Sequence, residues 1–384
     1  MVSVAVFIAL MGLGGCQMLP MSAELLEDRE ALLSGVAVFG EPVSADEIPD
    51  VDVLEVSDSM REFLDEQIGE SRIASVRFRR MFSGLAEGGY FTSSYAANTT
   101  RTAAETFQNR SGNCLSYTNM FVALSRAAGL DAAFQVVEVP PSWDADSGYL
   151  IRYTHINVVV KGFVFDTSYG EDFSVDFNDV LPDPDYPRHE ISDDEATSLF
   201  YANRSVSLMR AGDLRPAFAN LKKAIELTPD NADLWINLGA FYAKQNAFEQ
   251  AVQAYQAALY YDPYSRGAAS GLGRAHSLIG NTEESEYYLD QVRRYRERNP
   301  YFHYAVAQAE FEKANYDGAL SSINAALDLK YRSGRFHFLK GLTEHKLGDQ
   351  DAAEVSFRRA ARYGNYRDLK NRYVSEVAAA RPLG

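Results

Sequence analysis

The sequence predicts an α+β domain followed by an all-α array of helical hairpins, with a short apolar segment ahead of both. From residue 198 onward the chain repeats with a period of 34 residues, which is typical of stacked hairpins. Between residues 103 and 167, a helical pattern gives way to apolar runs that indicate strands. The 384 residues are enough for two domains and flanking segments.

The composition restricts the class of partner. Hydrophobic residues make up 46% of the chain and charged residues 23%, so most of it is expected to fold around apolar cores. The formal net charge is -16. Nucleic-acid binding depends on clusters of Lys and Arg that displace counterions, so we expect no DNA or RNA partner.

The repeat half carries the most regular signal. The repeats start at Ser198, Ala232, Arg266, Pro300 and Gly334. Small residues at the eighth and twentieth positions let two helices approach closely, as in tetratricopeptide repeats. We therefore predict five such repeats over residues 198–367, then a capping helix and tail over 368–384. Such an array forms a solenoid whose concave face is expected to bind a protein partner.

Cys114 is the candidate nucleophile. Ser111, Gly112 and Asn113 interrupt the chain just before an apolar helical pattern, so Cys114 lies at or near a helix amino terminus. Exposed amide groups and the helix dipole favour the thiolate there. The chain has only two cysteines, and its histidines show no metal-ligand spacing. We therefore predict neither a metal nor a cofactor.

A base and an acid follow on predicted strands. Strands are expected over residues 131–139, 149–160 and 163–167, with Lys161-Gly162 as a two-residue hairpin turn. In that register Asn157 lies opposite Asp166, and His155 is a diagonal neighbour on the same face. Asp166 could then hold one imidazole nitrogen of His155 while the other faces the thiol.

Four segments resemble motifs of the bacterial transglutaminase-like superfamily: Gly112-Asn113-Cys114, Arg126-Ala127-Ala128-Gly129, His155-Ile156-Asn157-Val158 and Phe165-Asp166-Thr167. The resemblance implies a papain-like domain, with its linker, over residues 57–195, in which the cysteine helix packs against an antiparallel sheet. It implies Cys114 as nucleophile, His155 as general base and Asp166 as orienting acid. For the oxyanion, the Cys114 amide is expected to donate. Gln108 is a further candidate, and Asn157 is a weaker one.

The first residues resemble a bacterial lipoprotein signal, although they lack the usual Lys or Arg. The apolar run over residues 2–13 is too short to span a membrane and ends in Leu13-Gly14-Gly15-Cys16. The resemblance implies a signal peptide over residues 1–16 and acylation of Cys16, which would attach the chain to a membrane. Gln17 in place of Asp implies the outer membrane of a bacterial envelope, facing the periplasm. The acidic residues 17–56 are expected to form a tether.

These features predict an envelope-anchored cysteine acyl-transfer enzyme that acts on a peptide or protein. Hydrolysis and transamidation both remain open, because they use the same three groups and differ in the acceptor. The alternative is a non-catalytic lipoprotein scaffold, in which the repeats bind a protein and the cysteine domain is a structural remnant. A third reading is an adaptor that holds peptide without cutting it.

Overall fold

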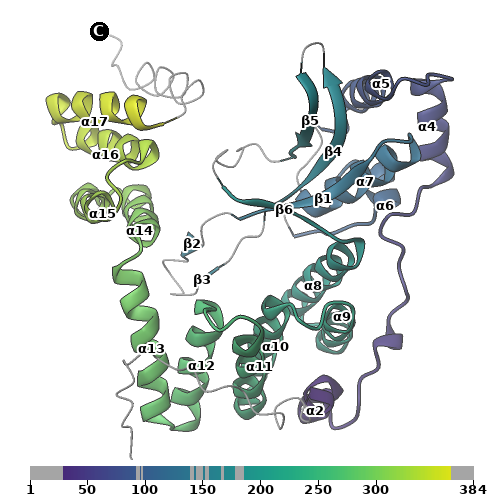
Figure 1. Cartoon of the computed structure of the whole chain (residues 1–384). Helices are drawn as coiled ribbons and strands as arrows, with labels where there is room; N and C mark the ends of the chain where they lie inside the picture. The colour runs from purple at the N-terminus through teal and green to yellow at the C-terminus, as the bar shows by residue number, and fades with distance from the viewer. Residues whose placement is uncertain are drawn as a thin grey trace, which may run out of the picture.

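The computed structural model describes residues 29–91, 96, 98–138, 142–143, 150–151, 155–165, 168–177 and 186–364. Over these residues the predicted fold class is confirmed, since a small α+β domain precedes an all-α array (Figure 1). Cys16, Asp166 and the capping helix predicted within residues 368–384 lie outside the described residues. Within them, no helix combines the length and the apolar character needed to cross a bilayer.

The first domain combines four helices with an antiparallel sheet. The helices are α4 (Asp58–Ile68), α5 (Ala74–Glu87), α6 (Ala103–Asn109) and α7 (Cys114–Ala127). The sheet has the order β5-β4-β1-β6, with strands β1 (Ala132–Val137), β4 (His155–Phe165), β5 (Ser168–Val175) and β6 (Arg188–Ile191). A separate pair, β2 (Ser142–Trp143) and β3 (Leu150–Ile151), lies between this sheet and the array in Figure 1.

Helix α7 lies on one face of the sheet. Alternate strand residues, Phe134, Ile156 and Val158, are buried in the same apolar core as Met120, Phe121 and Leu124 of α7. A fully buried side chain of this size contributes about 1.5–3 kcal/mol, so this layer holds the start of α7 in a constant place relative to the strands. The expected helix-on-sheet packing is therefore present.

The hairpin turn predicted at Lys161-Gly162 is wrong. Strand β4 continues through these residues to Phe165, and its register against β5 shifts between Val160 and Phe163. Gly162 has φ +71°, the left-handed conformation that a β-bulge often requires and that glycine adopts at little cost. The glycine therefore marks an irregularity within a strand, and the two strands pair over a longer stretch than predicted.

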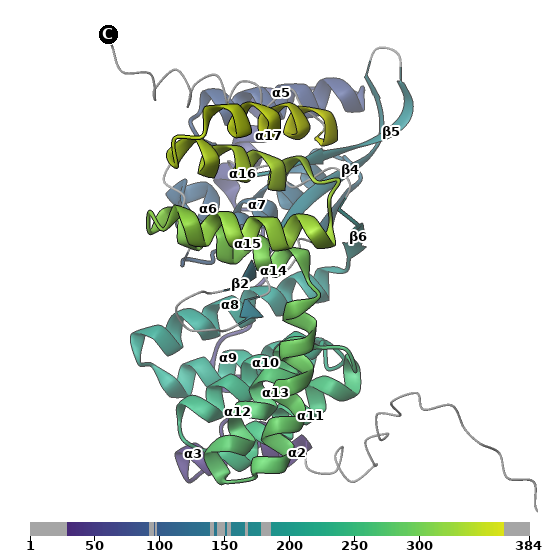
Figure 2. The same ribbon diagram turned by 90° about the vertical axis from the view of Figure 1, so that its left-hand side faces the viewer.

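Ten helices in five hairpins make up the array within the described residues. They are α8 (Asp193–Ala211), α9 (Leu214–Leu227), α10 (Ala232–Lys244), α11 (Phe248–Tyr261), α12 (Arg266–Ile279), α13 (Thr282–Glu297), α14 (Pro300–Glu312), α15 (Tyr316–Leu329), α16 (Gly334–Lys346) and α17 (Gln350–Tyr363). Four of them begin at the repeat starts read from the sequence: α10, α12, α14 and α16. Figure 2 shows the hairpins rising in a column, with α14–α17 in front of the sheet domain.

The core of the array is divided near α13. One apolar cluster continues from the first domain as far as Ala275 on α12, and a second one joins α14, α15 and α16. Helix α13 buries only Ser285 and Val292. It has 16 residues, against 14 in α11 and α15, so only a short connection remains before α14. A small cluster of Ala269 and Val292, with Phe302 packed against it, connects α12, α13 and α14, so the third repeat links the two larger clusters through few apolar residues.

Two buried histidines make the array sensitive to pH. His276 is 7% exposed and His337 is 1% exposed, and burial lowers the pKa of each imidazole below its ordinary 6.5. The unfolded chain then binds more protons than the folded one, so the stability from the neutral rings is present above pH 6.5 and is lost as pH falls through the lower folded-state pKa.

We expect the thermal midpoint to fall by several degrees between pH 7.5 and pH 5. The double variant His276→Gln/His337→Gln should show a smaller fall between the same two pH values, measured by circular dichroism. An equal fall in the variant and the wild type would contradict this assignment.

The segment expected to be a tether is instead bound to the protein from residue 29 onward. We call residues 29–56 the N-terminal strap; it contains α2 (Arg29–Ser34), α3 (Val36–Phe39) and a 3-10 turn, η1 (Ala45–Glu47). Leu32, Val43 and Val53 are each at most 3% exposed. The strap runs along the surface of the first repeats and then reaches the first domain, where the Ala103 amide donates to the Val53 carbonyl at 2.9 Å.

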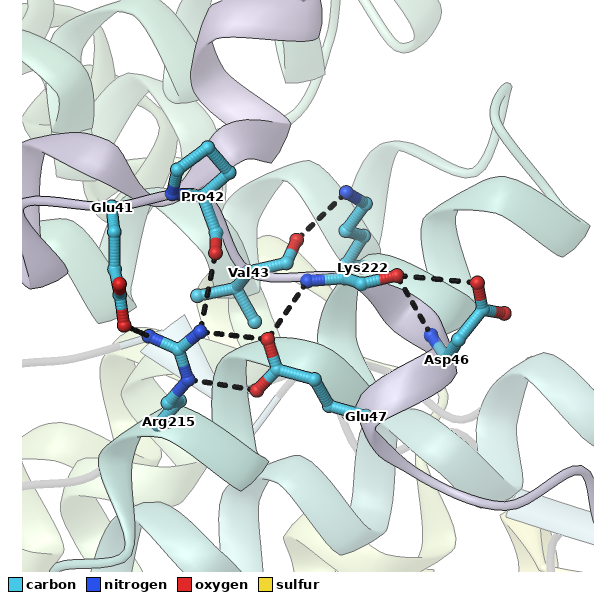
Figure 3. Close-up of polar contacts among 8 residues, drawn as sticks. Glu41, Pro42, Val43, Asp46, Glu47, Arg215 and Lys222 are labelled. Carbon is cyan, nitrogen blue, oxygen red and sulfur yellow. Dashed lines mark hydrogen bonds and ion pairs between the residues drawn. The ribbon is translucent and has the colours of Figure 1, made fainter.

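Basic residues of α9 bind the acidic side of the strap (Figure 3). Arg215 donates from two nitrogens to the Glu47 carboxylate, each at 2.7 Å, and lies 3.0 Å from Glu41. Lys222 donates to the Val43 carbonyl at 2.9 Å. The hydrogen bond from Arg215 lowers the pKa of Glu47. Acidic residues that suggested a solvated tether are therefore ion-pair partners of the first repeat.

Candidate active site

Cys114 is the first residue of α7, as predicted. Asn113 caps the helix, because its side-chain oxygen accepts from the Ser116 amide at 3.0 Å. Gly112 permits this approach, since a Cβ there would lie 2.4 Å from the Ser116 Cβ. Cys114 is partly exposed and belongs to the first turn of α7, whose amides have no carbonyl partner within the helix.

A short segment, residues 98–101, supports this helix start; we call it the brace. The Asn113 amide donates to the Thr99 carbonyl at 3.1 Å, and the Asn113 side chain donates to Thr100 Oγ1 at 2.7 Å. The Arg101 amide donates to Ser116 Oγ at 2.9 Å. The N-cap of α7 is thus held by residues from outside the helix as well as by its own side chains.

His155 is paired with a buried carboxylate, Asp176. The His155 Nε2 atom lies 2.5 Å from Asp176 Oδ2, and both side chains are 7% exposed. Asn157 donates to the same oxygen at 3.3 Å and is 2% exposed. Because Val158 pairs with Val175, Asn157 is level with Asp176 and His155 is its diagonal neighbour. The three polar side chains share one face of the sheet.

Asp176 is not among the site residues predicted from sequence, because the predicted strand pair ends at residue 167 and its register follows from a turn at Lys161-Gly162. In the structure Phe165 pairs with Ser168, and the longer strands bring Asp176 level with Asn157. The signal was Ser174-Val175-Asp176-Phe177, in which polar and apolar residues alternate. Asp166, the predicted orienting acid, lies outside the described residues, whereas His155 meets Asp176.

The two other oxyanion candidates have different surroundings. Gln108 lies on α6, whose buried residues are Ala103, Thr106 and Phe107, and its own side chain is exposed. Asn157 uses its amide nitrogen to bind Asp176, while its Oδ1 atom is buried without a hydrogen-bond partner. The amide nitrogen of Asn157 is therefore used to bind the Asp176 carboxylate. The role of Gln108 as an oxyanion donor stays a prediction.

Among the described residues, no group of His, Cys, Asp and Glu side chains could hold a metal ion. The polar groups described above can exchange a proton and orient an imidazole. An imidazole held by a carboxylate is the combination that cysteine nucleophiles use as base and orienting acid.

Models of known protein families match both parts of the chain. A model described as the transglutaminase-like superfamily matches residues 63–164. Two models described as tetratricopeptide repeats match residues 208–269, and 270–330 together with 304–367. The chain is a transglutaminase-like domain followed by tetratricopeptide repeats. The match of the transglutaminase-like domain includes Cys114 and His155 and ends before Asp176.

Relatives of known function share only part of the chain. The human protein O-mannosyl-transferase TMTC1 [Homo sapiens] is 27% identical over 173 residues, which are 41% of this chain and 19% of that protein. The chain thus spans about a fifth of that relative's length. Among solved structures, a crystal structure of MamA protein is 20% identical with a TM-score of 0.25, and covers 44% of this chain and 91% of its own.

A second MamA structure, an RS-1 double mutant, is 17% identical with a TM-score of 0.26, and covers 45% of this chain and 95% of its own. The tetratricopeptide repeats support protein–protein interaction in general.

Proposed function

We propose that the transglutaminase-like domain is a cysteine acyl-transfer enzyme, in which Cys114 is the nucleophile, His155 the base and Asp176 the orienting acid. The observation that carries the proposal is the buried His155–Asp176 pair, at 2.5 Å, in which His155 belongs to β4, whose residues Ile156 and Val158 share an apolar core with the Cys114 helix. A buried imidazole and carboxylate in contact are costly to fold unless they are used or fully paired, so such pairs concentrate at active sites.

The proposed reaction uses these groups in order. Because Nε2 of His155 bonds to Asp176, Nδ1 is the atom that takes the Cys114 proton. The thiolate attacks an amide carbonyl carbon, the C–N bond breaks, and His155 returns the proton to the leaving amine. Water or a second amine then attacks the thioester, and the sulfur leaves as the thiolate. Water gives hydrolysis, and an amine gives transamidation of a peptide or protein.

The remaining parts of the chain fit delivery of a protein substrate at a bacterial envelope. In this proposal the repeats hold the substrate protein, and acylated Cys16 anchors the chain to the outer membrane on its periplasmic side. Because residues 29–56 are bound to the folded domains, only residues 17–28 separate the strap from Cys16 in the sequence.

Alkylation of Cys114 across pH tests the chemistry without knowledge of the substrate. A chain without residues 1–16 should react with iodoacetamide well below the ordinary thiol pKa of about 8.5, because His155 stabilises the thiolate. His155→Ala should slow the reaction at pH 6 by about 10- to 100-fold, since each unit of thiol pKa changes the thiolate fraction tenfold.

The outcome also separates the enzyme from the non-catalytic scaffold. An ordinary thiol titration, unchanged by His155→Ala, would contradict the catalytic proposal and favour a scaffold that binds its partner through the repeats.

A further inference from the structure

The first repeat helix, α8, is linked to both ends of the Cys114 helix, directly at one end and through residues 98–101 at the other. At the carboxyl end of α7, Arg126 forms a two-bond ion pair with Asp193, the first residue of α8, at 2.6 and 2.9 Å. The same guanidinium donates from Nε to the Ala132 carbonyl at 2.9 Å. A forked contact of this kind fixes orientation as well as distance.

At the amino end of α7, the contact passes through the brace. Near the end of α8, Ser207 donates to the Asn98 carbonyl at 2.8 Å, and Arg210 donates to the Asn98 side-chain oxygen at 2.6 Å. Asn98 directly precedes Thr99 and Thr100, which hold Asn113, the residue before Cys114. Helices α7 and α8 therefore run in opposite directions, joined at both ends across more than sixty residues of sequence.

We infer that Ser207 and Arg210 are positioning residues for Cys114. Through these two side chains the repeat array fixes the position of the nucleophile. Within the proposed function, on which this inference rests, a protein bound to the first repeat then controls thiol reactivity. Only Asn98 and the two residues after it, Thr99 and Thr100, separate α8 from Asn113. If α8 moves or loses its hold on Asn98, the Thr99 carbonyl and the Thr100 hydroxyl shift, and Asn113 no longer fixes the first turn of α7.

A loosened first turn weakens the stabilisation of the thiolate in two ways. The amides of the first turn then lose their fixed direction, and Cys114 loses the fixed place relative to His155 that the proposed function requires. Small displacements of this kind reduce reactivity strongly, because aligned groups act only over short distances. The partner would be a protein that binds the array, since α8 is its first helix and the tetratricopeptide-repeat matches begin within α8, at residue 208.

The test compares Ser207→Ala/Arg210→Ala with Arg204→Ala. Arg204 is an exposed arginine on the same helix, and its guanidinium lies over the Phe200 ring of α8 itself. Alkylation of Cys114 in the double variant should be about fivefold to tenfold slower at pH 6. The pH at which its alkylation rate is half-maximal should be higher than in the wild type. The Arg204→Ala protein should follow the wild type, and thermal midpoints should agree among the three.

Hydrogen exchange of the peptide that contains residues 113–117 gives an independent readout. It should be faster in the double variant than in the wild type, because the N-cap of α7 is less well held. Unchanged exchange together with an unchanged alkylation profile would overturn the inference. If instead the wild-type thiol titrates ordinarily, the catalytic proposal fails, while the exchange rates still decide whether α8 positions the start of α7.

Discussion

Replacing Asp176 by Asn is expected to slow alkylation of Cys114 at pH 6 by about 10- to 100-fold. The carboxylate lies 2.5 Å from Nε2 of the imidazole. In the proposed mechanism it orients His155 and balances the positive charge that forms when His155 takes the thiol proton. An amide in the same place keeps the shape but removes the charge. The measurement is the rate of iodoacetamide labelling across pH, on protein that keeps the wild-type thermal midpoint.

Two further variants make this result decisive. Asp172→Asn changes an exposed carboxylate on β5, the strand that ends directly before Asp176, and should leave the labelling profile unchanged. Asp166→Asn decides between the two candidate acids. A larger loss of labelling rate in Asp166→Asn than in Asp176→Asn would contradict the assignment from the structure and support the one from the sequence.

Replacing Leu32 by Asp is expected to destabilise the protein by at least about 3 kcal/mol, because it places a carboxylate in an apolar site. Leu32 is 3% exposed, and its carbonyl accepts a hydrogen bond from the buried Tyr242 hydroxyl of α10. Burial raises the pKa of Tyr242, so this hydroxyl stays protonated and remains a donor. The strap should detach before the repeats unfold.

Urea unfolding and limited proteolysis measure the two parts of this prediction. The variant should show a lower urea midpoint and rapid cleavage within residues 29–56, whereas Glu30→Ala, an exposed change on the same helix, should match the wild type. If Leu32→Asp were as stable and as protease-resistant as the wild type, the original prediction of a solvated tether would be correct after all.

The strap also changes how an anchor would act on the protein. Its contacts reach α8 through Tyr201, which accepts from the Val51 amide at 3.1 Å, and reach α6 through Ala103. The strap, the first repeat and the transglutaminase-like domain therefore form one connected unit, and the division of the core near α13 lies beyond it.

The repeats and the cysteine helix could be predicted from sequence because their determinants are local. Each hairpin repeats the same small and large residues at fixed spacing, so α10, α12, α14 and α16 begin where the pattern places them. The start of α7 follows from Asn113, a capping residue adjacent to Cys114. His155 was placed on a strand because its neighbours Ile156 and Val158 alternate with polar residues.

Tertiary structure decided what depends on distant partners. The acid partner of His155 depends on the register between β4 and β5. The irregularity at Gly162 changes which residues of the two strands lie opposite each other, and local sequence does not determine this. The docking of the strap depends on the surface that α9 and α10 present, since a six-residue helix such as α2 is too short to be stable alone. Periodicity is local information, whereas register and docking are set by residues far apart in the chain.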